Sequence, residues 1–332
     1  MPVPAYKRES GPHAFAEHVA TWRDERRARD VPVRLYVPEP GHERLPLVLF
    51  SPGTGLSRDD YRYLGRHWAS HGYVAIHLTH PGSDPAALRR PDGTLRPIVE
   101  ILADVRHRHE RPQDVSFALD SVAAEPSWRE RVDPQRVAVA GHSFGAYTAL
   151  ALVGLRDQQM NQNGLSFADH RVQAVIAMSP ASEANLGQHP GSWDRVDRPV
   201  FALTGTKDTE LGVGTWERRR RCFDRSPARD QFLLIIRDAE HATFCDEIEL
   251  RIPTKPVPAA HHDYIRMATT AFLDAYVRAD AEAQQWLLGG ALAELSAGAC
   301  ALEYKNITSG KGSGTFSKPG RPHSERTPGK GS

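Results

Sequence analysis

Residues 141–145 read Gly141-His142-Ser143-Phe144-Gly145, a Gly-x-Ser-x-Gly pattern between an apolar stretch typical of a strand, 136–140, and a largely apolar stretch typical of a helix, 146–153. A serine at such a strand-to-helix turn occupies the tight bend called a nucleophile elbow, where glycines leave room for the neighbouring backbone. The pattern alone is common. Its placement between a strand and a helix favours a reactive Ser143 over a glycine-containing turn in which the serine merely caps the helix.

Short apolar runs repeat before and after this stretch, as expected for parallel strands that are covered on both faces. They alternate with helical periodicity, first around Leu64 and Trp68 with a stop at Gly72, and again over 114–122 with Pro112 near the helix start. The alternation predicts an α/β fold with a mostly parallel, doubly wound sheet. Strands are expected at 18–22, 31–37, 45–50, 73–78, 136–140, 172–178, 200–204 and 232–236, and a long helix at 264–278.

Two loops after later strands carry the residues that would activate a serine. Strand 200–204 leads to Asp208 and strand 232–236 leads to His241, which gives the order serine, acid, base. Asp208 is the expected acid because it follows a buried strand directly, and Glu210 stays open as the competing acid. Among 16 histidines, His241 is the expected base because it lies in the last such loop after the acid.

A glycine-containing segment, Ser51-Pro52-Gly53-Thr54-Gly55, follows the apolar strand 45–50. At this position the backbone N–H of Thr54, together with that of Phe144 after the serine, would form an oxyanion hole. The alternative is an ordinary glycine-rich turn. A phosphate-binding loop is not indicated, because the sequence has neither a Gly-x-x-x-x-Gly-Lys-Ser/Thr pattern nor a Gly-x-Gly-x-x-Gly pattern.

Other polar stretches have less specific interpretations. Residues 80–84, His80-Pro-Gly-Ser-Asp84, follow a strand end on the same side as the expected site, and a pocket-lining role stays open for them. The charge run 218–221 consists of arginines and is interpreted as a solvated helix face. Histidine pairs such as His261-His262 lack a supporting set of metal ligands, so no metal site and no cofactor are expected.

The composition of the chain argues against several classes of function. The 332 residues carry 42 Lys+Arg against 41 Asp+Glu, a formal net charge of +1, which gives no basic excess for binding nucleic acid. No apolar run reaches the roughly 20 residues of a membrane span, and the first residues lack the apolar core of a secretion signal. The three cysteines are expected to be free thiols rather than to include a Cys222–Cys245 pair, which favours a cytoplasmic location.

The chain is expected to hold one main domain. Residues 1–14 form an N-terminal extension, 15–305 the domain itself, and 306–332 a tail rich in Gly, Ser, Pro and Lys that is expected to be disordered.

At this point the sequence resembles a known family. The segments SPGTGLSRDDYRYLGRHWASHGYVAIHLTHPGSD, RPQDVSFALD, GHSFGAYTAL, LTGTKD and AEHATF together are similar to bacterial α/β-hydrolases related to platelet-activating-factor acetylhydrolase and described as dienelactone-hydrolase-like. The resemblance covers roughly residues 15–305. It implies an α/β-hydrolase fold and a serine esterase, with Ser143, Asp208 and His241 on the triad positions and Thr54 and Phe144 on the oxyanion positions. Because position 143 is serine, the cysteine chemistry of true dienelactone hydrolases is not implied.

Taken together, these features predict a metal-independent serine carboxylic-ester hydrolase that acts on a small-molecule ester through an acyl-enzyme. The polar stretch 157–164 is too short for a large lid, which favours short acyl chains. The alternative is a non-catalytic hydrolase-fold scaffold that binds a ligand. The presence of a nucleophile, a base, an acid and two oxyanion positions favours the enzyme.

Overall fold

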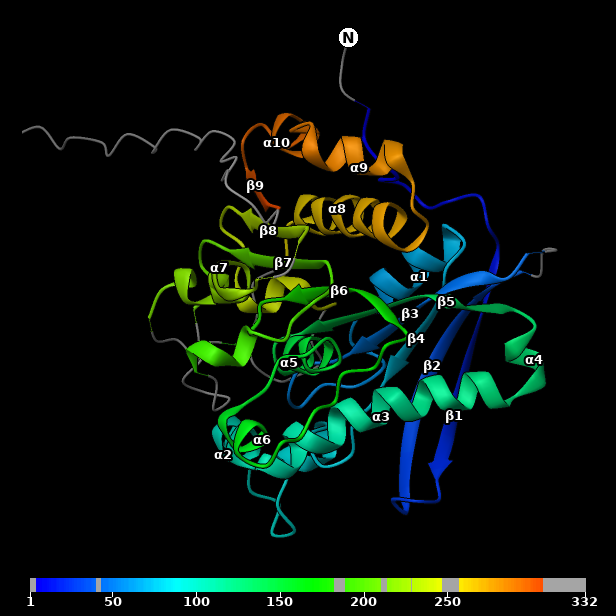
Figure 1. Cartoon of the computed structure of the whole chain (residues 1–332), viewed down its shortest axis with the longest axis vertical. Coiled ribbons are helices and arrows are strands. Elements are labelled where there is room, and N and C mark those ends of the chain that lie inside the picture. The colour runs from blue at the N-terminus through cyan, green and yellow to red at the C-terminus, as the bar shows by residue number, and fades with distance from the viewer. Residues whose placement is uncertain are drawn as a thin grey trace, which may run out of the picture.

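A single sheet organises the part of the chain that the computed structural model describes, namely residues 4–39, 43–181, 189–209, 214–227, 229–246 and 257–306. Within these residues nine strands are hydrogen-bonded in the order β1-β2-β4-β3-β5-β6-β7-β8-β9 (Figure 1). Their bounds are β1 Phe15–Asp24, β2 Arg29–Pro38, β3 Leu45–Ser51, β4 Val74–Leu78, β5 Val132–His142, β6 Val172–Met178, β7 Val200–Gly205, β8 Gln231–Ile236 and β9 Cys300–Lys305.

The strands from β4 to β8 in this order are parallel, whereas β2 and β9 pair antiparallel with the outermost parallel strands. β1 forms an antiparallel hairpin with β2 and closes one edge of the sheet. Parallel neighbours require crossover connections, and helices supply them on both faces. The expected α/β fold with a mostly parallel, doubly wound sheet is confirmed.

One face of the sheet is covered by α3 (Val105–Ala124), α5 (Phe144–Ala151) and α7 (Arg221–Arg225). The other face is covered by α1 (Arg62–Ser70) and α8 (Ala259–Val277), with α9 (Ala281–Leu288) packed beyond α8 (Figure 1). Shorter helical segments are α2 Ile98–Ala103, α4 Pro126–Arg129, α6 Gln158–Gln162 and α10 Ala291–Leu295, with 3₁₀ turns η1 Pro85–Leu88, η2 Pro190–Trp193, η3 Trp216–Arg220 and η4 His241–Phe244.

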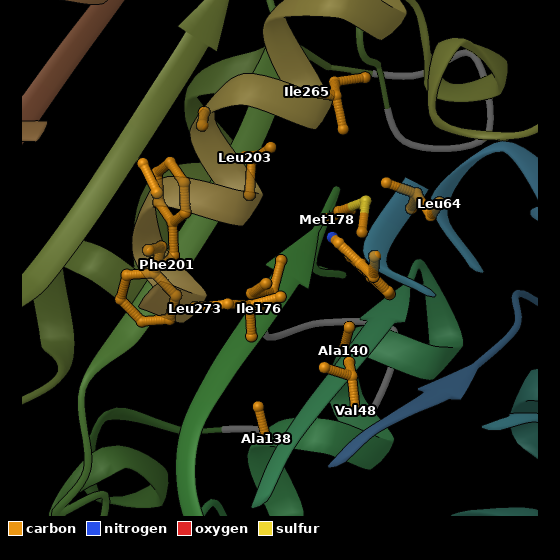
Figure 2. Packing of buried hydrophobic residues seen from close by; sticks show 14 of the residues in the cluster. Val48, Leu64, Ala138, Ala140, Ile176, Met178, Phe201, Leu203, Ile265 and Leu273 are labelled. Carbon is orange, nitrogen blue, oxygen red and sulfur yellow. The ribbon is translucent and has the colours of Figure 1, made fainter. Parts of the chain in front are cut away.

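The central strands bury side chains on both faces because successive residues point to opposite sides of a strand. In β3, Leu47 and Leu49 pack toward α3 and α5, while Val48 and Phe50 pack toward α1 and α8. Figure 2 shows this second cluster, in which strand side chains meet those of α8. Burial on both faces is the physical reason why these strands appear in the sequence as continuous apolar runs.

Two parts of the chain fold differently from the expectation. The helix expected over 114–122 begins at Val105, where the Asp104 side chain caps it by accepting a hydrogen bond from the Arg106 N–H. Pro112 therefore lies inside α3, and its buried ring offsets part of the cost of the missing N–H. β9 was not expected, because Cys300–Lys305 mixes apolar and charged residues, as half-buried edge strands do.

Some expectations concern residues outside the described ranges. The tail falls there from residue 307 onward, and so does Glu210. Cys222, Cys245 and Cys300 are described, and all three are free and buried. Within the described residues, no helix combines the length and the apolar character that a bilayer crossing needs.

A buried histidine in β4 makes the stability of the fold sensitive to acid. His77 is completely buried, and its ring centroid lies 5.0 Å from that of Tyr36 and 4.9 Å from that of Phe50. Neither ring nitrogen has a hydrogen-bond partner among the described residues. Burial lowers the pKa of His77 to about 3, because a charged imidazolium would lose its hydration there.

Replacing His77 by phenylalanine is expected to flatten the pH dependence of stability. Below about pH 6.5 the unfolded chain gains a proton at His77, whereas the folded chain stays neutral there down to about pH 3. Acid therefore favours unfolding of the wild type through this residue by about 1.4 kcal/mol per pH unit in that window. Between pH 7.5 and pH 5, the free energy of unfolding, measured by urea denaturation, should fall by about 2 kcal/mol less for His77→Phe than for the wild type. Equal losses would contradict this account.

Candidate active site

Ser143 lies in the turn between β5 and α5, where the chain reverses from strand to helix. Its backbone is left-handed, with φ 56° and ψ −116°, a region that non-glycine residues rarely adopt. The Ser143 N–H donates to the Met178 carbonyl at 2.9 Å, and the Ser143 carbonyl accepts from the Ala146 N–H at 3.0 Å. Its neighbours His142 and Phe144 are buried, whereas Ser143 itself is half-buried. The turn thus presents the serine at the carboxyl ends of the parallel strands.

The loop after β3 packs directly on this turn. A Cβ atom at Gly145 would lie 1.9 Å from the Ser51 carbonyl oxygen and 2.7 Å from that of Pro52. Only glycine permits this approach, so the last glycine of the pattern lets the Ser51–Thr54 backbone lie against the first turn of α5. The segment that leads to Thr54 therefore lies against the helix that begins at Phe144.

The structure brings Ser143, His241 and Asp208 within hydrogen-bonding distance, with His241 between the other two. His241 Nε2 lies 3.1 Å from Ser143 Oγ, and His241 Nδ1 lies 3.0 Å from Asp208 Oδ1. The His241 side chain is 39% exposed, whereas Asp208 is completely buried. Although burial opposes charge on Asp208, hydrogen bonding from His241 and the nearby cations lower the pKa of this carboxyl to about 2. Asp208 is thus a carboxylate at neutral pH.

Another close backbone contact explains why the acid and the base are neighbours. They follow the adjacent parallel strands β7 and β8, which are paired up to Gly205 and Ile236. A Cβ atom at Gly205 would lie 2.1 Å from the Ala239 carbonyl oxygen, and that oxygen accepts a hydrogen bond from the Lys207 N–H at 3.0 Å. The glycine in the LTGTKD segment therefore lets the two loops fold against each other.

Two further residues contact the acid and the base without having been expected there. Ser179, which follows β6, has its Oγ 2.7 Å from His241 Nδ1 and hydrogen-bonds the Asp208 carboxylate. Arg219 was assigned to a solvated face, yet its side chain is 3% exposed and its Nε lies 3.3 Å from Asp208 Oδ1. The position of Ser179 directly after a strand was a usable signal. Nothing in a run of four arginines distinguishes Arg219 from its neighbours.

A chain of hydrogen bonds ties the oxyanion loop to the loop of the base. The Gly53 N–H donates to Tyr61 Oη at 3.1 Å, and Tyr61 Oη lies 2.8 Å from His142 Nδ1. His142 Nε2 in turn lies 3.1 Å from the His241 carbonyl oxygen. Burial lowers the pKa of His142 well below its ordinary value, so the neutral ring accepts from Tyr61 at Nδ1 and donates from Nε2.

The two expected oxyanion donors remain unengaged. Within the described part of the chain, neither the Thr54 N–H nor the Phe144 N–H donates a hydrogen bond to another group of the protein. Two N–H groups beside a serine can bind an oxygen on which negative charge develops. The hydrogen-bonded Ser143, His241 and Asp208 can therefore activate a hydroxyl and orient an imidazole.

A separate cavity of about 720 Å³ lies beside η1 and α2. Neither Ser143 nor His241 lines it, so it does not house their chemistry. In the described ranges, no group of three or more histidine, cysteine, aspartate or glutamate side chains is placed to hold a metal ion. The charged residues that line the cavity are Arg29, Arg89, Arg90, Arg96, Arg106, Glu100 and Glu110.

Known proteins resemble this chain over most of its length. A model of the Alpha/beta hydrolase family matches residues 48–304. Platelet-activating factor acetylhydrolase from Cavia porcellus is 23% identical over 295 residues, covering 77% of this chain and 63% of that protein. The protein of the same name from Canis lupus familiaris is 22% identical over 244 residues, covering 61% of this chain and 49% of that protein. The chain thus spans half to two thirds of the length of these relatives.

Among solved structures, a ferulic acid esterase from Streptomyces cinnamoneus is similar, with a TM-score of 0.55 at 21% identity. The match covers 80% of this chain and 89% of that chain. This likeness supports the fold that the strand order already shows.

Substituting Gly145 by alanine is expected to be costly, because the new Cβ would overlap the Ser51 carbonyl at 1.9 Å. We expect the free energy of unfolding to fall by about 3 kcal/mol in urea denaturation, at the upper end of the range for overpacking. Gly164→Ala is the control, since a Cβ there meets nothing within 4 Å. Only the backbone φ of +65° disfavours alanine at that position, so the free energy of unfolding should fall by about 1 kcal/mol. If both variants lose the same stability, the contact between loop and helix is not tight.

Proposed function

The chain belongs to the alpha/beta hydrolase family, and from that premise we propose that it is a serine hydrolase that cleaves carboxylic esters through an acyl-enzyme. One observation carries the proposal: His241 lies between Ser143 Oγ and the Asp208 carboxylate, at 3.1 and 3.0 Å. This is the geometry in which an imidazole accepts a serine proton at one nitrogen while a carboxylate fixes its other nitrogen. We assign the activity to residues 15–305.

In the proposed mechanism, Ser143 Oγ attacks the carbonyl carbon of the ester while His241 Nε2 takes the hydroxyl proton. The carbonyl oxygen becomes an oxyanion that accepts hydrogen bonds from the Thr54 and Phe144 N–H groups. When the tetrahedral intermediate collapses, His241 gives the proton to the leaving alcohol and the acyl group stays on Ser143. A water molecule then repeats the same steps, releasing the carboxylic acid and restoring the serine hydroxyl.

The role of Asp208 follows from its charge. Because its pKa lies at about 2, the carboxylate is ionised throughout the neutral range and accepts the Nδ1–H of His241. That bond fixes the tautomer in which Nε2 carries the free lone pair facing Ser143. Arg219 also supports the ionised state of Asp208, because its Nε lies 3.3 Å from the same oxygen, Oδ1, that faces His241.

For the substrate we propose small esters with short acyl chains, acetyl to butyryl. The relatives from Cavia porcellus and Canis lupus familiaris are named as acetylhydrolases. Between α5 and β6, the helix α6, Gln158–Gln162, is five residues long, which is too short to cover a long lipid chain.

A fluorophosphonate probe tests the enzyme directly. Ser143 should attack the phosphorus and displace fluoride, so folded wild-type protein is expected to gain one adduct, located at Ser143 by peptide mass spectrometry. Ser143→Ala should take no label and hydrolyse no p-nitrophenyl acetate. Ser127→Ala removes an exposed serine and should behave as the wild type. A folded wild-type protein without an adduct would instead support a binding scaffold.

A series of p-nitrophenyl esters tests the acyl preference. We expect kcat/KM to be highest from acetyl to butyryl and at least about tenfold lower for octanoyl, because a pocket that excludes several methylenes forfeits their binding energy. A steady increase of kcat/KM with chain length, or a jump of activity at a lipid interface, would overturn the short-acyl proposal while leaving the hydrolase intact.

A further inference from the structure

The mechanism does not use Arg111, a cation of α3 that is 1% exposed. Its guanidinium donates hydrogen bonds to Ser83 Oγ at 2.7 Å, Thr148 Oγ1 at 3.0 Å and Ser51 Oγ at 3.1 Å, and also to the Pro52 carbonyl oxygen. These acceptors come from the end of β3 and the residue that follows it, from the loop after β4 and from helix α5. One side chain thus joins three segments that are far apart in the sequence.

Two of those segments hold the expected oxyanion donors. Pro52 lies two residues before Thr54, and Thr148 lies on α5, one turn after Phe144. The Arg111 guanidinium carbon also lies 4.5 Å from the centroid of the Phe144 ring, a cation–π contact. Arg111 therefore contacts both the loop of one donor and the residue that carries the other.

A second Ser-His-Asp set fixes the position of Ser51. His80 Nε2 lies 2.9 Å from Ser51 Oγ, and His80 Nδ1 lies 2.9 Å from Asp114 Oδ2. Burial lowers the pKa of His80 to about 4, so the neutral ring donates a hydrogen bond from Nδ1 to Asp114 and accepts one at Nε2 from the Ser51 hydroxyl. All three residues are 0% exposed and cannot meet an ester. This set therefore supports the loop. Of the stretch 80–84, Pro81 and Gly82 line the separate cavity beside η1 and α2.

The charge of Arg111 is retained at neutral pH. Burial lowers its pKa to about 9, which still leaves the guanidinium protonated. Asp114, three residues later on the same helix, is ionised because hydrogen bonds from His80 and Arg29, and the charge of Arg29, lower its pKa to about 2 in spite of burial. The buried cation thus has hydrogen-bond acceptors on several sides and a carboxylate close by in the same network.

We propose that Arg111 is a positioning residue that holds the Ser51–Thr54 loop and the first turn of α5 at the spacing that oxyanion binding requires. The inference rests on the proposed esterase function. It implies that the guanidinium acts through Pro52, Ser51, Thr148 and the Phe144 ring, without touching the substrate. Loss of Arg111 should therefore weaken binding of the transition state more than binding of the ester.

Arg111→Met is the test, with p-nitrophenyl acetate as substrate and a short trifluoromethyl ketone as probe. The ketone forms a tetrahedral adduct with Ser143 whose oxygen occupies the oxyanion hole. We expect kcat to fall about 10²-fold, as for loss of one oxyanion donor, with KM within about twofold. The inhibition constant of the ketone should rise by the same factor as kcat falls, which a general loss of stability would not produce.

Arg278→Met is the matched control. The Arg278 side chain also donates to two backbone carbonyls, of His71 and Gly72, both at 2.9 Å, and its Cζ lies 4.2 Å from the centroid of the Tyr73 ring. Those residues directly precede β4 and so lie at the amino ends of the parallel strands, whereas Ser143 lies at their carboxyl ends. Arg278→Met should lower the melting temperature but leave kcat and the inhibition constant of the ketone unchanged.

The outcomes separate the two proposals. If the wild type takes no fluorophosphonate and hydrolyses no ester, the proposed function fails and the inference fails with it. If the wild type is active and folded Arg111→Met keeps its kcat, the inference alone is overturned. Should Arg111→Met not fold, Arg111→Lys replaces it, because an ammonium cannot span the same acceptors. For Arg111→Lys, a drop in kcat of about tenfold or more, with a matching rise in the inhibition constant of the ketone, supports the inference. Wild-type values of both constants overturn it.

Discussion

The left-handed backbone of Ser143 is the constraint on which the rest of the site depends. A conformation that costs of the order of 1–3 kcal/mol persists only when its surroundings determine it fully. Here the Ser143 N–H is bound to the Met178 carbonyl of β6, and the turn is pressed against the Ser51 carbonyl through Gly145. The same packing that stabilises the turn also sets the distance between the serine and the Thr54 loop. Strain and site geometry therefore have one cause.

The structure also buries charged side chains. For the carboxylates Asp208 and Asp114, neighbouring groups compensate the charge. Asp208 is surrounded by His241, Ser179, Thr204 and Arg219, and Asp114 by two arginines and His80. A charge in a protein interior is tolerated when partners replace its hydration, and removing one partner leaves the other uncompensated. Asp208 and Asp114 thus keep their charge in the interior because neighbouring groups replace the hydration that burial removes.

The sequence allowed the architecture to be predicted, and it singled out Ser143, Asp208 and His241 as candidates, because both have local signals. Apolar runs marked the parallel strands. Ser143 follows β5 directly, and Asp208 and His241 lie in the loops that follow β7 and β8, so the parallel order brings all three to the carboxyl ends of the strands. The supporting residues lack such signals. Arg111 and Arg219 are buried only through tertiary packing, and nothing in their neighbours in the sequence distinguishes them from solvated arginines. The helix start at Val105 was missed because the Asp104 cap outweighs the effect of Pro112.

The buried Ser51–His80–Asp114 set also bears on the order in which the chain assembles. Its contacts join residues 29 and 34 positions apart, and Arg111 reaches Ser51 across 60. Closing such separations costs chain entropy that is recovered only when every partner has arrived. The loop after β3 can therefore reach its final shape only after β4 and α3 have docked on the sheet. The reactive arrangement therefore cannot be complete in any partly folded state that lacks β3, the loop after β4 or α3.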